Sequence, residues 1–315
     1  MNSILSVLNF SALEKRYSSS IGYSYALVCH LFFVIANLVV KKTGKHLNVF
    51  QMLYGIAVQL IIYNFTILKT KKIPICSNKT LTTKLLFLRA ILGPLGACCG
   101  IFGFVLLPLS EASALQMTTP AIAAILAAIF LGETYDLIMF LNSVFCFAGV
   151  VLISKPSFIF SENAGNEIFE YRSLGILLTV TGAILGGFIQ IVLKKLGSLT
   201  TPYANTFHFG VFLALVTSFG QVIKGVNEVS MVDGIAITAV GLMNFISHTL
   251  MNKSYSFGNA GTISLMFYSQ VFFAYVIDIF YERIAPDFYS VLGSLSIFSC
   301  VFFTLLRLRR QSGGE

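Results

Sequence analysis

Arg89 is the residue with the clearest chemical potential, because it places a fixed positive charge inside the apolar run 83–107. Burying a charged group at the centre of a membrane costs at least about 2.5 kcal/mol. One interpretation is that the long side chain turns back toward the membrane surface beside Lys84. The other is that Arg89 faces an internal cavity, where its planar donor fork binds a carboxylate or phosphate. The sequence leaves both interpretations open.

Three histidines, His30, His208 and His248, also lie inside apolar runs. A single histidine in such a run is usually neutral, packed and hydrogen-bonded. The alternative is proton transfer, because imidazole changes charge near neutral pH. His30 and His248 are therefore candidates for proton coupling. Asp278 and Glu282 share one helix face; they could bind a coupling cation, although exposure at the membrane surface is the simpler explanation.

Uncharged polar residues form a second group inside the apolar runs. With Arg89 and His248, the candidate substrate-binding residues are Gln116, Thr118, Thr119, Gln190, Asn244, Tyr268 and Gln270. Basic residues at the ends of runs form a third group: Lys41, Lys42, Lys194, Lys195 and Lys253. These lysines could concentrate anions at the two mouths of a pathway. The alternative is ordinary anchoring at the membrane interface.

The signatures of enzymes and metal sites are missing from the sequence. It contains no His-Glu-x-x-His, no Gly-x-Ser-x-Gly and no phosphate-cradling Gly-Lys-Ser/Thr loop. The six cysteines lack a zinc-type spacing with supporting histidines. We therefore expect no catalytic residues, no metal and no cofactor, and the sequence predicts a protein that is not an enzyme.

Membrane-spanning helices must position these residues. Hydrophobic residues make up 56% of the 315 residues and charged residues 11%, whereas soluble domains have about 25% charged residues. A spanning helix needs about 20 mostly apolar residues. Ten runs qualify: 21–40, 47–68, 83–107, 111–131, 136–154, 173–193, 203–223, 232–251, 259–280 and 286–306. The predicted fold is an all-α polytopic membrane protein with ten transmembrane helices.

The distribution of lysine and arginine predicts the orientation. With the N-terminus in the cytosol, the inner segments hold thirteen basic residues and the outer loops seven, so we expect both termini to be cytosolic. The net charge of +8 reflects this bias, so we expect a lipid bilayer and a small-molecule substrate as partners and no nucleic acid. The plasma membrane and an internal membrane both fit this multi-pass protein.

The two halves of the chain repeat one another. Lys41-Lys42 and Lys194-Lys195 close equivalent runs at an offset of 153 positions, and Ala112-Ser113-Ala114 corresponds to Ala260-Gly261-Thr262. Five spans in each half mean that the second half enters the membrane from the opposite side. Such inverted repeats are typical of secondary transporters, with the substrate site between the repeats. The predicted divisions are an N-terminal tail 1–20, a first repeat 21–156, an outer loop 157–172, a second repeat 173–306 and a C-terminal tail 307–315.

The first half carries a specific resemblance. Its motifs are Arg89-Ala90-Ile91-Leu92-Gly93, Leu107-Pro108-Leu109-Ser110-Glu111-Ala112-Ser113-Ala114-Leu115, Thr118-Thr119-Pro120, Phe130-Leu131-Gly132-Glu133 and Gly149-Val150-Val151-Leu152-Ile153-Ser154-Lys155-Pro156. This stretch resembles the EamA-type half of the drug/metabolite transporter superfamily, and the chain is most similar to subfamily G of solute carrier family 35. The likeness is looser over Gly175–Leu306, where Glu282 lacks a preceding glycine. It implies ten helices as two inverted five-helix repeats, with helices one, three, four, six, eight and nine lining a cavity and a possible homodimer through helices five and ten.

Two residues of the fourth run have structural expectations of their own. Pro120 removes one backbone hydrogen bond within the membrane, and Thr118 and Thr119 can partly replace it. Glu133 ends the run, and we expect it to cap the next helix or to pair with a lysine in a loop.

The sequence thus predicts a secondary transporter of a small organic, anionic metabolite that works by alternating access. The alternative is a membrane-embedded regulatory partner protein without transport activity. Polar residues at membrane depth favour transport, because a partner protein does not require them. Substrate, coupling ion, direction and oligomeric state do not follow from the sequence.

Overall fold

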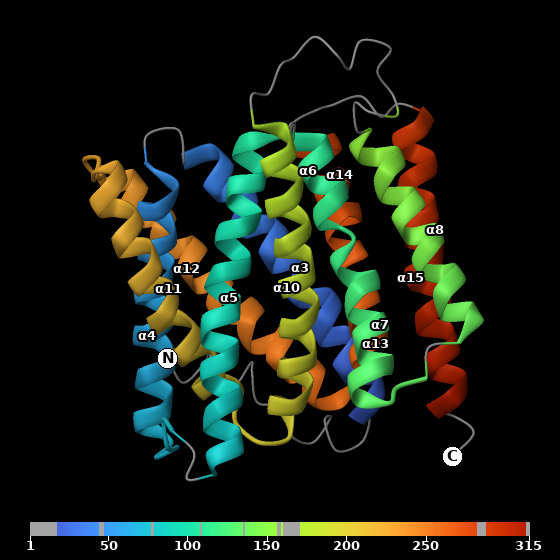
Figure 1. Ribbon diagram of the computed structural model, residues 1–315, viewed down its shortest axis with the longest axis horizontal. Helices are drawn as coiled ribbons and strands as arrows, with labels where there is room; N and C mark the ends of the chain where they lie inside the picture. The colour runs from blue at the N-terminus through green and yellow to red at the C-terminus, as the bar shows by residue number, and fades with distance from the viewer. Residues whose placement is uncertain are drawn as a thin grey trace.

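The computed structural model describes residues 18–43, 47–76, 79–107, 109–134, 136–155, 159, 171–281 and 288–312. Its helices stand side by side in one bundle (Figure 1). They are α3 (Ser18–Thr43), α4 (Val49–Thr70), α5 (Thr80–Leu106), α6 (Leu109–Gln116), α7 (Thr119–Leu131), α8 (Leu137–Ser154), α10 (Arg172–Gly197), α11 (Pro202–Lys224), α12 (Met231–Phe257), α13 (Ala260–Leu265), α14 (Tyr268–Tyr281) and α15 (Phe288–Ser312).

The predicted membrane-spanning helices are present. Among the described residues, nine helical segments are long and apolar enough to cross a membrane, and Phe288–Thr304 is a shorter apolar helix. Large apolar side chains such as Phe145, Leu177 and Phe298 are exposed on the outside of the bundle, as lipid contact requires. The predicted all-α membrane fold is confirmed. Because α3 begins at Ser18 and α15 ends at Ser312, both helices extend into the segments that we expected to be tails.

Side-chain caps close several helix ends. The Asn48 side chain accepts hydrogen bonds from the first turn of α4, including one of 2.7 Å from the amide of Phe50. Asp136 caps α8 by accepting from the amide of Met139 at 3.0 Å. The first amides of a helix have no partner within the helix, so these caps fix where each span starts.

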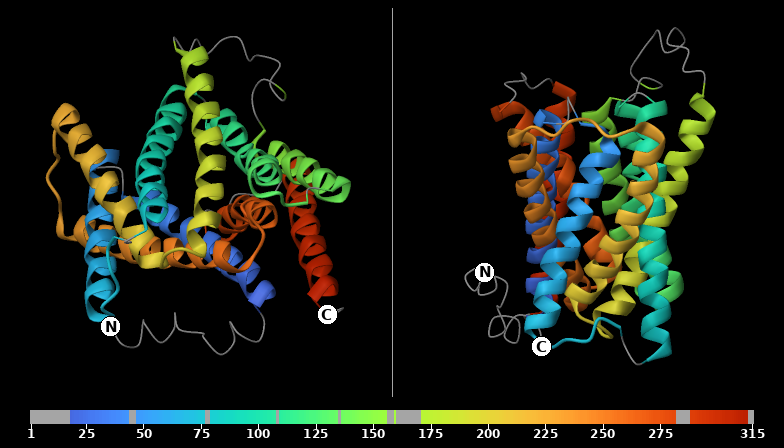
Figure 2. Two further views of the ribbon diagram at one scale, coloured as in Figure 1. Left: turned by 60° about the horizontal axis from the view of Figure 1, so that its bottom comes forward. Right: turned by 90° about the vertical axis from the view of Figure 1, so that its left-hand side faces the viewer.

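The two halves pack through equivalent pairs of helices. α5 lies along α10 and α3 along α12, while α4 packs on α11 and α8 on α15. In the repeat, α3, α4, α5 and α8 correspond to α10, α11, α12 and α15. Replacing each helix by its counterpart therefore turns the pair α5–α10 into the pair α12–α3, and it leaves α4–α11 and α8–α15 unchanged. α8 with α15 and α4 with α11 lie at opposite sides of the bundle (Figures 1 and 2). In Figure 1, α5 runs upward whereas its counterpart α12 runs downward, which is the arrangement of an inverted repeat.

The fourth span is interrupted between α6 and α7. Pro120 has no amide hydrogen to donate, and the hydroxyls of Thr118 and Thr119 donate to the carbonyl oxygens of Leu115 and Gln116, each at 2.7 Å. The threonines therefore compensate part of the backbone bonding that proline removes, as predicted.

The ninth span is interrupted at the equivalent place, between α13 and α14, without a proline. Here the amide of Phe267 donates to the carbonyl of Ser264 and the amide of Ser269 to that of Met266, each at 3.0 Å. Hydrogen bonds to the third preceding residue tighten the chain into a short 3₁₀ turn. The sequence predicted the lost backbone bond at Pro120 within a continuous fourth span, and it gave no indication of the break in the ninth span.

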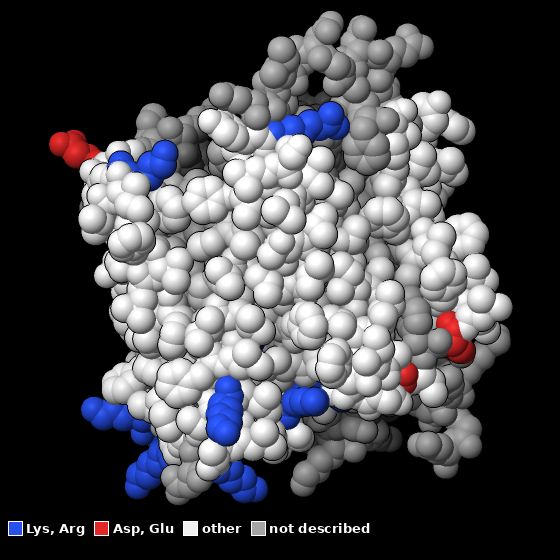
Figure 3. Space-filling view, viewed as in Figure 1, with Lys and Arg blue, Asp and Glu red and all other residues white. Residues whose placement is uncertain are grey.

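Basic side chains gather at one end of the bundle, the lower end in Figure 3. We call it the lysine-rich end; it contains the connections α4–α5, α7–α8, α10–α11 and α12–α13. Its described basic residues are Lys69, Lys71, Lys72, Lys79, Lys84, Lys194, Lys195 and Lys253. We call the opposite end the far end. Between the two ends, the face drawn in Figure 3 shows no lysine or arginine side chain among the described residues; acidic side chains appear at its right, above the level of the lysines of the lysine-rich end.

Candidate functional site

Arg89 lies inside the bundle. It is nine residues from the start of α5 at the lysine-rich end, which corresponds to a depth of about 14 Å along the helix. Its side chain is only 5% exposed. Nε and Nη1 are buried and have no hydrogen-bond partner among the residues that the structure describes. A guanidinium that is buried without hydrogen bonds is energetically costly, so this environment needs an explanation.

The direction of the Arg89 side chain argues against a return to the membrane surface. Side chains on a helix normally lean toward its N-terminus, which for α5 is the lysine-rich end. Nη1 instead lies against Gly93, one turn farther from that end. The charged group therefore points toward the middle of the membrane, and the glycine leaves the space that it occupies.

Aromatic side chains continue from the guanidinium across the bundle. The ring of Phe209 on α11 is centred 4.5 Å from Cζ of Arg89 and 5.0 Å from the ring of His248 on α12. The His248 ring is 5.3 Å from that of Phe33 on α3, in an edge-on arrangement. Cation–π contacts of this kind stabilise a cation by about 0.5–2 kcal/mol, which offsets only part of the desolvation cost.

His30 extends this series to the break in the ninth span. Its ring is centred 6.4 Å from that of Phe33 and 4.2 Å from that of Phe267. It is fully buried, and neither ring nitrogen has a hydrogen-bond partner in the described part of the chain. We call the side chains Arg89, Phe209, His248, Phe33, His30 and Phe267 the aromatic row. It crosses between the halves, since α3 and α5 belong to the first and the other elements to the second.

The comparisons with known proteins agree with this fold. Residues 20–155 match the sequence profile of the EamA-like transporter family. Solute carrier family 35 member G1 of Mus musculus is 24% identical over 293 residues, which cover 91% of this chain and 78% of that protein. The protein of the same name from Homo sapiens is 25% identical over 300 residues, covering 91% and 79%. The first half of the chain therefore matches the EamA-like transporter family, and most of the chain is similar to solute carrier family 35 member G1.

More distant matches extend the picture. Pseudopaline exporter CntI of Pseudomonas aeruginosa is 20% identical over 220 residues, which cover 69% of this chain and 73% of that protein. One protein of known crystal structure superposes with a TM-score of 0.77 over 93% of this chain and 99% of its own, at 14% identity, and so shares the fold. The names of the relatives indicate a transporter rather than an enzyme and support membrane transport as the activity.

Gln116 and Gln190 make no hydrogen bond to Arg89 among the residues that the structure describes. Gln190 is buried on α10 and accepts a 2.7 Å hydrogen bond from the hydroxyl of Tyr255 on α12. Oε1 of Gln116 is buried beside Gly100, without a hydrogen-bond partner in the described residues. Gly100 is eleven residues from Arg89 on α5, or about 16 Å along the helix. Gln116 therefore lies well away from Arg89 along α5, and Gln190 is bonded to Tyr255 instead.

The other neutral candidates have mainly local partners. Thr118 and Thr119 bond within the first break, as described above, and Asn244 donates to the carbonyl of Val240 at 2.9 Å. Tyr268 is fully buried, and Gln270 is partly buried on α14. Outside this set, Nδ1 of His208 is 2.8 Å from the carbonyl oxygen of Ala204, in keeping with a packed, hydrogen-bonded histidine.

Of the basic residues predicted at the pathway mouths, two contact other parts of the protein and one is exposed. Nζ of Lys194 donates to the carbonyl of Gly258 at 2.7 Å, and Nζ of Lys253 lies 5.6 Å from the ring centre of Tyr25. Lys195 is exposed. Lys41 and Lys42 end α3, but their side chains lie outside the described structure, as do the side chain of Asp278 and the whole of Glu282.

Glu133 makes a contact that sequence reasoning did not anticipate. Its carboxylate accepts hydrogen bonds of 2.8 Å from the amides of both Ala260 and Gly261, at the start of α13. We expected a cap on the next helix or a lysine pair, but α8 is capped by Asp136. Glu133 does cap a helix, but one that lies in the other half of the chain.

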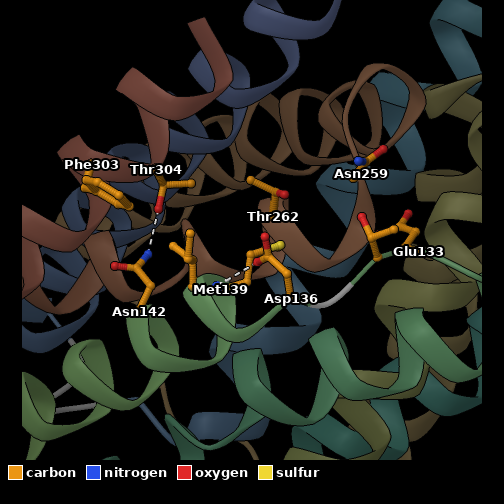
Figure 4. Close-up of a pocket in the computed structure, with 10 residues that line it drawn as sticks. Glu133, Asp136, Met139, Asn142, Asn259, Thr262, Phe303 and Thr304 are labelled. Carbon is orange, nitrogen blue, oxygen red and sulfur yellow. Dashed lines mark hydrogen bonds between the residues drawn. The ribbon is translucent and has the colours of Figure 1, made fainter. Parts of the chain in front are cut away.

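A small polar pocket adjoins Glu133 at the lysine-rich end (Figure 4). It has a volume of about 70 Å³, and its lining includes Asp136, Asn142, Thr262 and Thr304. The amide of Asn142 donates to the hydroxyl of Thr304 at 2.7 Å. Both carboxylates of this region serve as helix caps, so the polar groups here are explained largely by contacts within the protein.

Proposed function

We propose that this chain is a secondary transporter that moves a small organic anion by alternating access between its two halves. The observation that carries the proposal is the buried guanidinium of Arg89, with Nε and Nη1 free of hydrogen-bond partners in the described structure. A buried charge without a counter-charge is strongly unfavourable. A bound carboxylate or phosphate supplies the missing charge and fits the planar donor fork.

The aromatic row supports an organic substrate rather than a simple inorganic anion. Phe209, Phe33 and Phe267 offer apolar surface next to the one cationic group of the row. Ligand sites commonly combine such surface with a few polar groups that fix orientation. In this proposal Arg89 binds the acid group, and the rings contact the carbon part of the substrate.

Unequal packing at the two ends of the bundle supports alternating access. At the lysine-rich end, α7 packs on α13 and α10 packs on α12. The equivalent far-end pairs, α6 with α14 and α3 with α5, make at most marginal contact among the described residues. If the two repeats had the same arrangement, the equivalent helix pairs at the two ends of the bundle would pack equally. Unequal packing therefore indicates that one mouth is closed and the other open. We infer a state closed at the lysine-rich end, which the basic bias assigns to the cytosol.

Uptake into proteoliposomes tests the proposal. The purified chain is offered a panel of labelled carboxylates, amino acids and nucleotide sugars, alongside the variants Arg89→Ala and Lys84→Ala. Lys84 is the matched control, because it is an exposed cation on the same helix. We expect saturable uptake of an anion that Arg89→Ala reduces at least tenfold and Lys84→Ala leaves unchanged. No uptake of any compound by a folded protein would instead favour a regulatory partner without transport activity.

A further inference from the structure

Glu133 supplies a helix cap that α13 lacks. The cap residue in the chain, Asn259, makes no side-chain hydrogen bond to the first turn of α13. Both oxygens of the Glu133 carboxylate instead receive backbone amides from that turn, each at 2.8 Å. A carboxylate at a helix N-terminus also interacts favourably with the helix dipole. The start of α13 therefore depends on a side chain 127 residues earlier in the sequence.

The same turn is held by further contacts from neighbouring helices. Lys194 of α10 donates to the carbonyl of Gly258, immediately before Asn259. The hydroxyl of Ser264 on α13 donates to the carbonyl of Pro120 on α7 at 3.2 Å. α7 and α13 pack on each other along this contact, and both lie at the lysine-rich end in Figure 1.

These contacts occur where the structure is closed. α7 belongs to the first half and α13 to the second, so every hydrogen bond between them joins the two halves. The equivalent helices at the far end, α14 and α6, pack marginally at most within the described residues. Opening the lysine-rich mouth requires α7 and α13 to separate, and separation leaves the first amides of α13 without Glu133.

We propose that Glu133 is the gate residue of the lysine-rich mouth: its bond to the start of α13 stabilises the state closed at that end and is broken whenever the mouth opens. This role rests on the alternating access proposed above. It makes Glu133 a positioning residue, because its carboxylate contacts backbone amides and acts on transport only by setting the balance between two states. Substrate exchange on that side must then disrupt both hydrogen bonds in every cycle.

Hydrogen–deuterium exchange measured by mass spectrometry tests the role without a known substrate. The full chain in lipid nanodiscs is compared with Glu133→Ala and with Glu133→Gln, which keeps the side-chain size and one oxygen acceptor. For Glu133→Ala we expect at least about tenfold faster exchange in 258–266. In 109–116, the equivalent segment at the far end, we expect slower exchange, because the population moves to the state closed there. Glu133→Gln should change both segments in the same directions by smaller factors.

Asp136→Ala is the matched control, since it also removes a carboxylate cap from the same connection, but one within a single half. It should speed exchange at the start of α8 and leave 109–116 unchanged. Faster exchange in 258–266 without slower exchange in 109–116 would overturn the gate role and reduce Glu133 to a local cap. Uptake measured on the same preparations separates the two proposals: uptake without the reciprocal exchange pattern removes only the gate.

Discussion

Replacing Arg89 with lysine tests whether the guanidinium binds the substrate through two hydrogen bonds or whether only its positive charge is needed. In the structure, Nε and Nη1 are both available, and a carboxylate can accept from two guanidinium nitrogens at once. Lysine keeps the charge but presents a single ammonium group, so one charge-assisted hydrogen bond is lost. Such a bond contributes about 1.5–3 kcal/mol, which corresponds to about 10- to 150-fold in affinity.

The assay is the initial rate of uptake as a function of substrate concentration. We expect Arg89→Lys to raise KM by 10- to 150-fold on that arithmetic, with protein yield and elution profile unchanged. Arg89→Ala should abolish saturable uptake. A KM for Arg89→Lys within about twofold of the original would refute the reasoning, because a charge that only anchors the helix is served equally well by either cation.

Three further predictions follow from the same structure. Gly93→Ala should raise KM about tenfold, because a methyl group there meets Nη1 of Arg89 and lies 2.9 Å from the Phe209 ring. Gly96→Ala is the control, since its methyl group lies 3.4 Å from the nearest atom. Equal effects of the two substitutions on KM would refute the prediction. His30→Gln should leave the pH dependence of uptake unchanged, because a fully buried imidazole without hydrogen-bond partners in the described structure is disfavoured as a cation; a lost response to a pH gradient would instead assign proton coupling to His30. A C-terminal tag should be cleaved by protease added to the cytosolic face of sealed membranes, and protection of the tag would reverse the proposed orientation.

The spans could be predicted because lipid imposes a length and a composition on every spanning helix. The apolar runs located the spans, but some helices extend several residues beyond the predicted ends, whereas α4 and α15 begin two residues later than predicted. α10, for example, continues past the predicted 193 through Lys194 and Lys195 to Gly197. Polar residues at the membrane surface continue a helix as readily as apolar ones do, so hydropathy alone places such ends too early.

The candidate site was only partly predictable. Arg89 was found because a charge inside an apolar run is rare, whereas Phe209, Phe33 and Phe267 are three of 30 phenylalanines that nothing local distinguishes. Their role depends on helices that meet only in the folded bundle. Thr118 and Thr119 bond within one turn, and their contacts were predicted. The surroundings of Gln116 and Gln190 are set by neighbouring helices and were not predicted: Oε1 of Gln116 is buried beside Gly100, and Gln190 bonds to Tyr255.

The contact of Glu133 shows the same limit. The sequence indicated a capping role, because a carboxylate at the end of a run favours nearby helix amides. It could not indicate α13, since the two segments are brought together only by the packing of the two halves. The break before Tyr268 was missed because no proline marks it, and the Ser264 hydroxyl next to its 3₁₀ turn bonds to Pro120 in the other half of the chain.

Counterflow in proteoliposomes tests the central claim most directly. Vesicles containing the purified chain are loaded with a high concentration of unlabelled anionic substrate and diluted into a trace of the labelled compound. Alternating access predicts a transient accumulation of label above equilibrium, because a carrier that returns loaded exchanges faster than one that returns empty. Arg89→Ala should remove this overshoot. Label that enters only to equilibrium, at a rate independent of the internal substrate, would contradict the account and indicate a channel or leak instead.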